Sequence, residues 1–230
     1  AHGYDLSGST ATITVDNDLE FFSSSNYGFL VLGHEIQLNG NVSSGDVLAM
    51  STVVDIVGNT AQTYTCSGAG VTVRLPVGTT STFSSTTTDA GLSSITVEAG
   101  TFVAPTGTLS IGYNLSNNPT TSNNTLVVTG GTFTHNSGSI ILEASCTSYA
   151  SRTALVTATI PLTLNDVTFS GGYEKNHPSW ALVYGFSGSS AAITVEGDLV
   201  LTKTQPYAPW LNGGTLTLQG NLTCTNCSGG

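Results

Sequence analysis

A nine-residue phrase recurs along this chain, and it constrains the fold more than any other feature of the sequence. Residues 13–21 and 193–201 match position by position, and residues 216–224 have the same form. Each phrase has three alternating residues, a polar bend of two or three residues, and three more alternating residues. Both flanks place their apolar side chains on one side. Because such a unit cannot bury its apolar side alone, we expect the copies to stack.

Looser variants of the phrase lie at residues 95–103, 126–134 and 162–169. The copies are about 20 to 40 residues apart, which is the range in which repeat architectures occur. The phrases therefore predict a parallel β-solenoid, or β-helix, with threonine methyls on the pleat and hydroxyls facing water. Stacked threonine, serine and asparagine side chains would form ladders along its axis. A β-sandwich or jelly roll whose strands happen to look alike is the alternative interpretation.

Composition also favours β-structure throughout the chain. Good helix formers other than leucine are sparse, whereas threonine and serine number 37 and 28 of the 230 residues. We therefore expect an all-β protein of short strands separated by Gly, Asn, Asp and Ser. The clearest strands are expected at residues 12–15, 19–22, 29–32, 35–38, 53–57, 71–75, 95–97, 109–111, 126–128, 140–142, 162–164, 193–195, 199–201 and 216–218.

We expect a single domain over residues 1–230, with irregular coils or a cap over 1–90 and clearer repeats over 91–230. No segment reads as a linker flanked by shifts in composition. The chain ends in Ser228-Gly-Gly, where another repeat would be expected, which is consistent with a longer protein. Polar runs predict loops that leave the stack, and these lie at residues 78–94, 113–124, 145–159 and 171–190.

The charge of the chain argues against two classes of partner. Asp and Glu number 14 against 4 Lys and Arg, which gives a formal net charge of −10. Nucleic-acid binding needs clustered cations, and so does binding to an anionic membrane surface. No apolar run approaches the roughly 18 residues of a membrane span, so we expect no membrane insertion. The start at Ala1 has no charged region followed by an apolar stretch, so we expect a secreted, extracellular or cell-surface protein whose signal peptide has been removed.

The supply of titratable groups gives no catalytic constellation, so we expect no enzyme, no metal site and no cofactor. Asp16, Asp18 and Glu20 alternate and would share one face of a strand. Their counterparts in residues 193–201 make them exposed bend residues instead. The one dense charged cluster, residues 174–177, reads as a solvated loop.

Four cysteines allow three disulfide pairings. Because the composition is typical of a secreted chain, we expect disulfides from Cys66 to Cys146 and from Cys224 to Cys227. Buried free thiols are the alternative. A zinc site is not favoured, since Cys224 and Cys227 have no second pair or histidines at suitable spacing.

Aromatic residues gather toward the end of the chain, and four of them form the candidate ligand-binding set. Exposed in a row, they would stack on sugar faces or on a neighbouring subunit. Covering a core end or pinning a loop is the alternative. These four residues are Trp180, Tyr184, Tyr207 and Trp210. The candidate N-glycosylation sites are Asn41, Asn114, Asn123, Asn221 and Asn226, of which Asn114 and Asn123 are the best acceptors.

The phrases at residues 130–138, 193–199 and 211–222 resemble the β-strand repeats of large secreted bacterial surface proteins, similar to autotransporter and filamentous-haemagglutinin passenger domains. The resemblance covers residues from about 91 to 230 and, before them, only residues 12–22. It implies a parallel β-solenoid on the cell surface or in an extracellular fibre. It carries over no catalytic residue, because the family pattern is structural.

We therefore expect a non-enzymatic structural or adhesive β-solenoid that builds a cell-surface fibre or filament. Self-association would proceed by strand addition at open ladder edges. A carbohydrate-binding or polysaccharide-cleaving β-helix, with a glycan as partner, is one alternative, since the aromatic residues and scattered acids fit it. A pilin-like β-sandwich subunit, completed by a donor strand from residues 10–19, is another.

Overall fold

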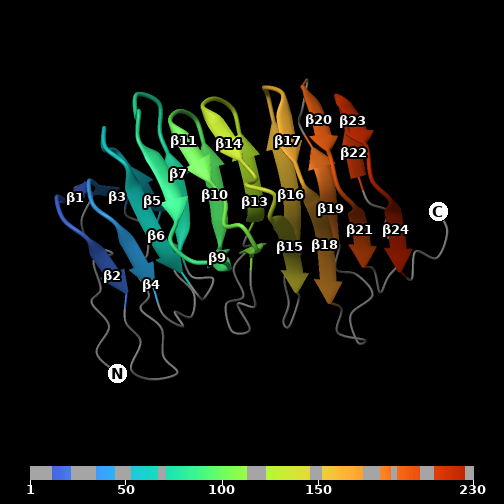
Figure 1. Ribbon diagram of the computed structural model, residues 1–230, viewed down its shortest axis with the longest axis horizontal. Coiled ribbons are helices and arrows are strands. Elements are labelled where there is room, and N and C mark those ends of the chain that lie inside the picture. The colour runs from blue at the N-terminus through green and yellow to red at the C-terminus, as the bar shows by residue number, and fades with distance from the viewer. Residues whose placement is uncertain are drawn as a thin grey trace.

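The computed structural model describes residues 12–21, 35–44, 53–66, 71–112, 123–145, 152–172, 182–187, 191–202 and 210–225. These residues form 24 β-strands and no helix (Figure 1). Every strand pairing among them is parallel. The chain is therefore a parallel β-solenoid, as the repeated phrase predicts. The sandwich, the jelly roll and the pilin-like subunit are wrong, because their sheets are antiparallel.

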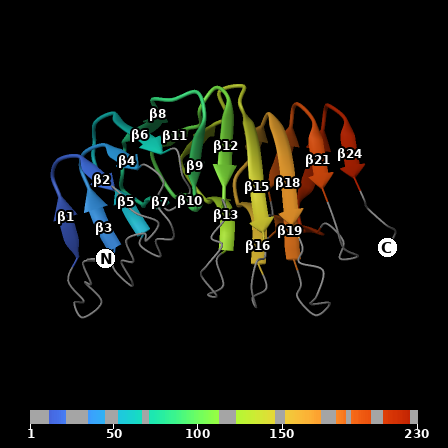
Figure 2. The ribbon, with the colours of Figure 1, turned by 90° about the horizontal axis from the view of Figure 1, so that it is seen from below.

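The first strand of each coil belongs to one continuous sheet, sheet A. Its nine strands lie side by side in chain order, from blue at one end of Figure 1 to red at the other, as a second view confirms (Figure 2). They are β1 (Ile13–Val15), β3 (Glu35–Leu38), β5 (Val53–Ile56), β7 (Thr72–Leu75), β10 (Ser94–Val97), β13 (Asn123–Val128), β16 (Arg152–Ala158), β19 (Leu182–Ser187) and β22 (Trp210–Asn212).

The second strand of each coil belongs to sheet B and, later in the chain, to sheet D. The ladder is interrupted between the last strand of sheet B and the first of sheet D, although the two lie against each other. Sheet B contains β2 (Leu19–Phe21), β4 (Val42–Ser44), β6 (Gln62–Cys66), β8 (Thr82–Ser85), β11 (Thr101–Val103) and β14 (Thr132–Thr134). Sheet D contains β17 (Leu162–Leu164), β20 (Ala192–Val195) and β23 (Thr215–Leu218).

From the fourth coil onward, each coil adds a third strand, and these form sheet C. The third strand continues the turn of the chain before it returns to sheet A in the next coil. Sheet C contains β9 (Ala90–Leu92), β12 (Thr108–Ile111), β15 (Ser139–Ser145), β18 (Asp166–Gly172), β21 (Leu199–Thr202) and β24 (Leu222–Thr225).

The register confirms that copies of the phrase stack on one another. Ile193 pairs with both Leu162 and Leu216, and Ile95 pairs with Leu126. Residues 13–21, however, turn from sheet A into sheet B, whereas residues 193–201 turn from sheet D into sheet C. The two segments therefore share a local conformation but not a place in the fold. Any bend between two strands that face one core needs the same pattern of apolar and polar residues.

The core is a set of columns that run along the solenoid axis. Buried Ile, Val and Leu side chains fill the interior, with aromatic rings in the column beneath sheet B. Phe83, Phe102 and Phe133 pair in register, and their ring centroids are 6.1 and 5.6 Å apart in succession. Tyr64 stacks on Phe83 at 4.9 Å. Stacked aromatic pairs add roughly 1 kcal/mol each beyond the area they bury.

All four expected loop excursions are wrong at least in part. Residues 78–94 contain β8 and β9, residues 145–159 contain β16, and residues 171–190 contain β19. In β8 only Phe83 is apolar, and its neighbours Thr82 and Ser84 carry hydroxyls. This single residue fills the core column, so the sequence shows no alternation of apolar and polar residues there. In the remaining excursion, residues 123–124 begin β13, and residues 113–122 lie outside the described residues. The strand expected at 29–32 also lies outside them.

Candidate functional site

Side chains at the first bend continue the hydrogen-bond ladder from coil to coil. Asp18 Oδ1 accepts hydrogen bonds from the backbone nitrogen of Asn41 at 2.9 Å and from its Nδ2 at 2.8 Å. Asn41 Oδ1 accepts in turn from the backbone nitrogen and the hydroxyl of Thr63, at 2.8 and 2.9 Å. Asp16 accepts from Asn39 Nδ2 at 3.1 Å. Asp16 and Asp18 are thus exposed bend residues, as predicted, and they also tie successive coils together.

The bend before sheet C repeats this arrangement with other residues. Asp166 Oδ1 accepts from the backbone nitrogen of Asp198 at 2.8 Å. Asp198 Oδ1 accepts from the backbone nitrogen and Nδ2 of Asn221, at 2.7 and 2.9 Å. In each step the carboxylate lies one coil before its donor. A hydrogen bond to a charged acceptor contributes about 1.5–3 kcal/mol when buried, and less at exposed bends such as these.

A buried polar network joins three coils beneath the first bend. The Gln62 amide nitrogen donates to the carbonyl of Leu38 at 3.2 Å and to that of Gly40 at 2.7 Å. Its oxygen accepts from the Ser81 hydroxyl at 2.7 Å. Gln62 and Ser81 are both buried, so these bonds offset the cost of removing the amide from water.

Glycine is required where the later coils pass this bend. Gly100 and Gly131 have φ values of 64° and 63°, which residues with a Cβ rarely adopt. A Cβ added at Gly100 would lie 2.6 Å from the Ser81 carbonyl oxygen, and one at Gly131 would lie 2.6 Å from the Ala99 carbonyl carbon. The bends are therefore tight against the preceding coil.

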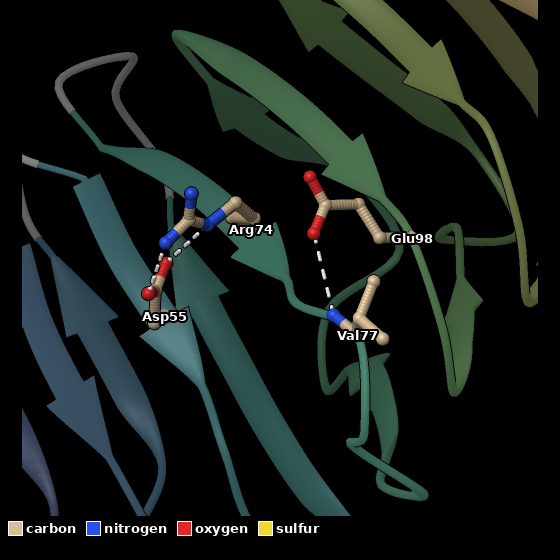
Figure 3. A network of polar contacts seen from close by, with 4 residues as sticks. All are labelled: Asp55, Arg74, Val77 and Glu98. Carbon is tan, nitrogen blue, oxygen red and sulfur yellow. Dashed lines mark hydrogen bonds and ion pairs between the residues drawn. The ribbon is translucent and has the colours of Figure 1, made fainter.

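One arginine forms a bidentate ion pair on the outward side of sheet A (Figure 3). Arg74 Nε lies 2.8 Å from Asp55 Oδ1, and Nη2 lies 2.5 Å from Oδ2. Asp55 is 3% exposed, so the ion pair offsets the cost of removing its carboxylate from water. Nearby, Glu98 Oε2 accepts from the backbone nitrogen of Val77 at 3.3 Å (Figure 3).

A second polar contact spans the bend before sheet C. His135 Nε2 lies 3.6 Å from Glu196 Oε2, and His135 Nδ1 accepts from the backbone nitrogen of Ser137 at 3.1 Å. Asn136 and Ser137 both have positive φ values, of 52° and 57°. The imidazole thus holds a strained bend closed and lies against a carboxylate from a later coil.

Burial raises the pKa of two residues in the core and of one residue on the outward side of sheet C. Burial raises the pKa of Tyr64, and the neighbouring Cys66 raises it further. Burial likewise raises the pKa of the Cys66 thiol. Both groups are therefore neutral at neutral pH, and a neutral thiol is a poor nucleophile. Partial burial also raises the pKa of Glu143 on β15.

The structure contradicts one of the two predicted disulfides. Cys66 is a free thiol, 1% exposed, at the end of β6, so the Cys66–Cys146 disulfide is wrong. Its side chain faces the core of sheet B next to its register partner Ser44, whereas Cys146 follows β15 of sheet C, outside the described residues. Cys224 lies on β24, but Cys227 is outside the described residues, so that pairing stays a prediction.

The predicted ligand-binding aromatics are only partly placed. Tyr184 and Trp210 belong to β19 and β22, which are neighbours in sheet A. Trp180 and Tyr207 lie outside the described residues, as do residues 174–177. Binding by this group stays a prediction.

The predicted glycosylation sites also stay a prediction, although the structure places three of them. The Nδ2 atoms of Asn41 and Asn221 donate in the bend ladders, so glycosylation there would remove a contact between coils. Asn123 begins β13, and Asn114 and Asn226 lie outside the described residues.

Columns of threonine run along the outward side of sheets B and D. Thr82, Thr101 and Thr132 pair in register, and they confirm that threonine ladders follow the axis. A second column pairs in the same way and consists of Thr163, Thr194 and Thr217. The sequence predicts ladders in general, but it does not show that they concentrate on one side, because that depends on coil lengths.

Comparisons with protein-family models, with curated proteins and with solved structures found no match to this chain. Within the described residues no group of three or more His, Cys, Asp or Glu side chains is placed to hold a metal ion. Over the same part of the chain, no helix has the length and apolar character needed to cross a membrane.

Proposed function

We propose that this chain is a non-enzymatic, extracellular structural or adhesive β-solenoid and a building block of a cell-surface fibre or filament. The observation that carries the proposal is sheet A, in which nine successive strands pair in parallel. Such a ladder grows by about 4.8 Å with each coil. Within the described residues its outermost strands are β1 and β22, and an edge strand is a template for the addition of another strand.

The last described coil supports assembly through its apolar residues. Leu222 is 61% exposed, and Leu216 and Leu218 are only half-buried, although all three lie in core columns. A coil from a second copy, placed after β23 and β24, would cover them. Burial of a leucine side chain contributes about 1.5–3 kcal/mol, so covering these columns would favour contact between copies.

The low charge of the chain also fits a durable extracellular element. The contacts between coils consist mainly of backbone ladders and apolar columns, and the charged contacts are the carboxylate hydrogen bonds at the bends and the ion pair of Asp55 with Arg74. A rod built in this way depends little on ionic contacts, so its stability should change little with salt.

Electron microscopy and sedimentation of the purified chain test the proposal. We expect rods that lengthen with concentration. Leu222→Lys, which places a charge on the edge strand β24, should shorten or abolish them. Val77→Lys is the matched control, because Val77 is 81% exposed in a turn away from the outermost coils. Globular monomers at every concentration, or equal effects of the two substitutions, would contradict assembly through the edges.

A further inference from the structure

One side of the solenoid carries no charge over six coils. The strands β8, β11, β14, β17, β20 and β23 contain no Asp, Glu, Lys or Arg. Their inward residues are Phe, Leu, Ile and Val apart from Ser85, and their outward residues form what we call the threonine face. It consists of Thr82, Ser84, Thr101, Val103, Thr132, Thr134, Thr163, Ala192, Thr194, Thr215 and Thr217.

The other two sides do not share this composition. Over the same six coils, the strands of sheet A include Arg74 on β7 and Arg152 on β16. Sheet C carries Glu143 and Asp166 outward, among apolar and hydroxyl residues. Threonine suits any β-strand, so β-propensity alone would enrich all three sides equally. In a chain of net charge −10, the threonine face is therefore a distinct surface.

The threonine face consists of two arrays with fixed repeats, one over β8, β11 and β14 and one over β17, β20 and β23. Neighbouring threonines in a column are about 4.8 Å apart, and alternate residues on one strand are about 6.6–6.8 Å apart. Each threonine presents a hydroxyl and a methyl on a stiff χ1 bond, so the array changes little in solution. The partner that fits it is uncharged and itself periodic at intervals of this size.

We propose that the threonine face binds the surface of ice. Water oxygens in the planes of an ice crystal repeat at intervals of the same order as the two threonine repeats. The hydroxyls donate to and accept from lattice water, while the methyls lie in the spaces between water molecules. A charged side chain would orient water around itself and disrupt the lattice, which accounts for the absence of charge from these strands.

Two other occupants fit the threonine face less well. Sugar sites stack rings on aromatic side chains and orient hydroxyls with carboxylates or amides, and the outward residues here include none of these. A second copy of the chain would bury roughly 400 Å² on each side, from six strand spacings and about four residues of strand length, whereas a stable interface needs about 800 Å² per partner.

Measurements of ice growth test the proposal with matched variants. Wild-type chain should separate the freezing point from the melting point of a seed crystal and limit recrystallisation of fine-grained ice. Thr194→Lys, in the middle of its column, should lose both effects. Thr168→Lys is the control, because Thr168 is also half-buried but lies outward on sheet C between Ile141 and Val200. It should keep both effects.

Thr217→Lys provides a second test where Thr194→Lys fails to fold, since Thr217 is exposed on β23. Circular dichroism checks the fold of each variant. The proposal is overturned by a wild-type chain without effect on ice, or by equal losses from substitutions on the two sheets. Two further results would overturn it. In the first, substitution on the threonine face abolishes binding to insoluble chitin or cellulose but keeps the wild-type effect on ice. In the second, substitution abolishes a dimer seen in sedimentation but keeps that effect.

Discussion

The last two described coils carry nearly the same phrase, yet their apolar residues differ in burial. In the penultimate coil Ile193 is 2% exposed and Leu199 is 4% exposed. Their register partners in the last coil are Leu216, which is half-buried, and Leu222, which is 61% exposed. The apolar residues of a coil are therefore buried only where a neighbouring coil lies on each side of it. The core of this fold thus forms between coils and not within one coil.

The largest effect is expected in the middle of the aromatic column. Phe102→Ala removes a fully buried ring that contacts rings of three coils, so we expect a loss of about 4 kcal/mol in the free energy of unfolding. Urea denaturation measures it. Leu218→Ala in the last coil should cost clearly less, and equal losses would mean that burial does not depend on neighbours on both sides.

The next effect concerns the ion pair between neighbouring coils. Arg74→Leu leaves the buried Asp55 carboxylate without its bidentate partner, and we expect a loss of about 3 kcal/mol. Because Arg74 is 30% exposed, the value should lie toward the lower end of the range for buried pairs. The double variant Asp55→Val with Arg74→Leu should recover most of the loss. A double variant as unstable as the single one would count against the pairing.

A smaller effect is expected at the bend that joins the last two coils. Asp198→Ala removes the acceptor of two hydrogen bonds from Asn221, with an expected cost of about 1 kcal/mol because the site is partly exposed. Amide hydrogen exchange should accelerate across β24 and stay unchanged in β18. Asp198→Asn keeps an acceptor oxygen and should retain most of the protection. Uniform acceleration over the whole chain would show that the bend does not act locally.

The smallest effect completes the comparison of the two coils. Leu222→Ala should change the free energy of unfolding of the monomer by no more than about 0.5 kcal/mol, as for other exposed positions. Leu199→Ala, at the register partner, should cost about 2–4 kcal/mol. Thermal unfolding at low protein concentration measures both. Similar shifts for the two leucines would remove the distinction between covered and uncovered coils.

The fold could be predicted from the sequence because its signal is local. Three alternating residues on each side of a polar bend define both strands and the side that is buried, and residues 35–38 and 162–164 are strands with the expected bounds. Strands with one inward apolar residue, such as β8 with Phe83, give no such signal. The interval between register partners ranges from 18 residues (Ile36 to Val54) to 32 (Val167 to Leu199), so alignment of coils was not predictable.

The candidate sites were less predictable than the fold because they arise between coils. Asp18 and Asn41 are 23 residues apart, and only the register shows that one accepts hydrogen bonds from the other. The same holds for Cys66. Its side chain points into the core from β6 as a free thiol, although the composition of the chain favours a disulfide. The threonine face likewise depends on which residues of successive coils are neighbours.

Distances between spin labels test most directly whether successive coils stack in register. Labels carried by unnatural amino acids leave the native cysteines in place. Positions 14, 96 and 157 occupy one outward column of sheet A. Position 96 is four coils after position 14, and position 157 is six coils after position 14. We expect backbone separations of about 19 Å from Thr14 to Thr96 and about 29 Å from Thr14 to Thr157. A Thr157 label as close to Thr14 as the Thr96 label, or closer, would contradict the stacked solenoid.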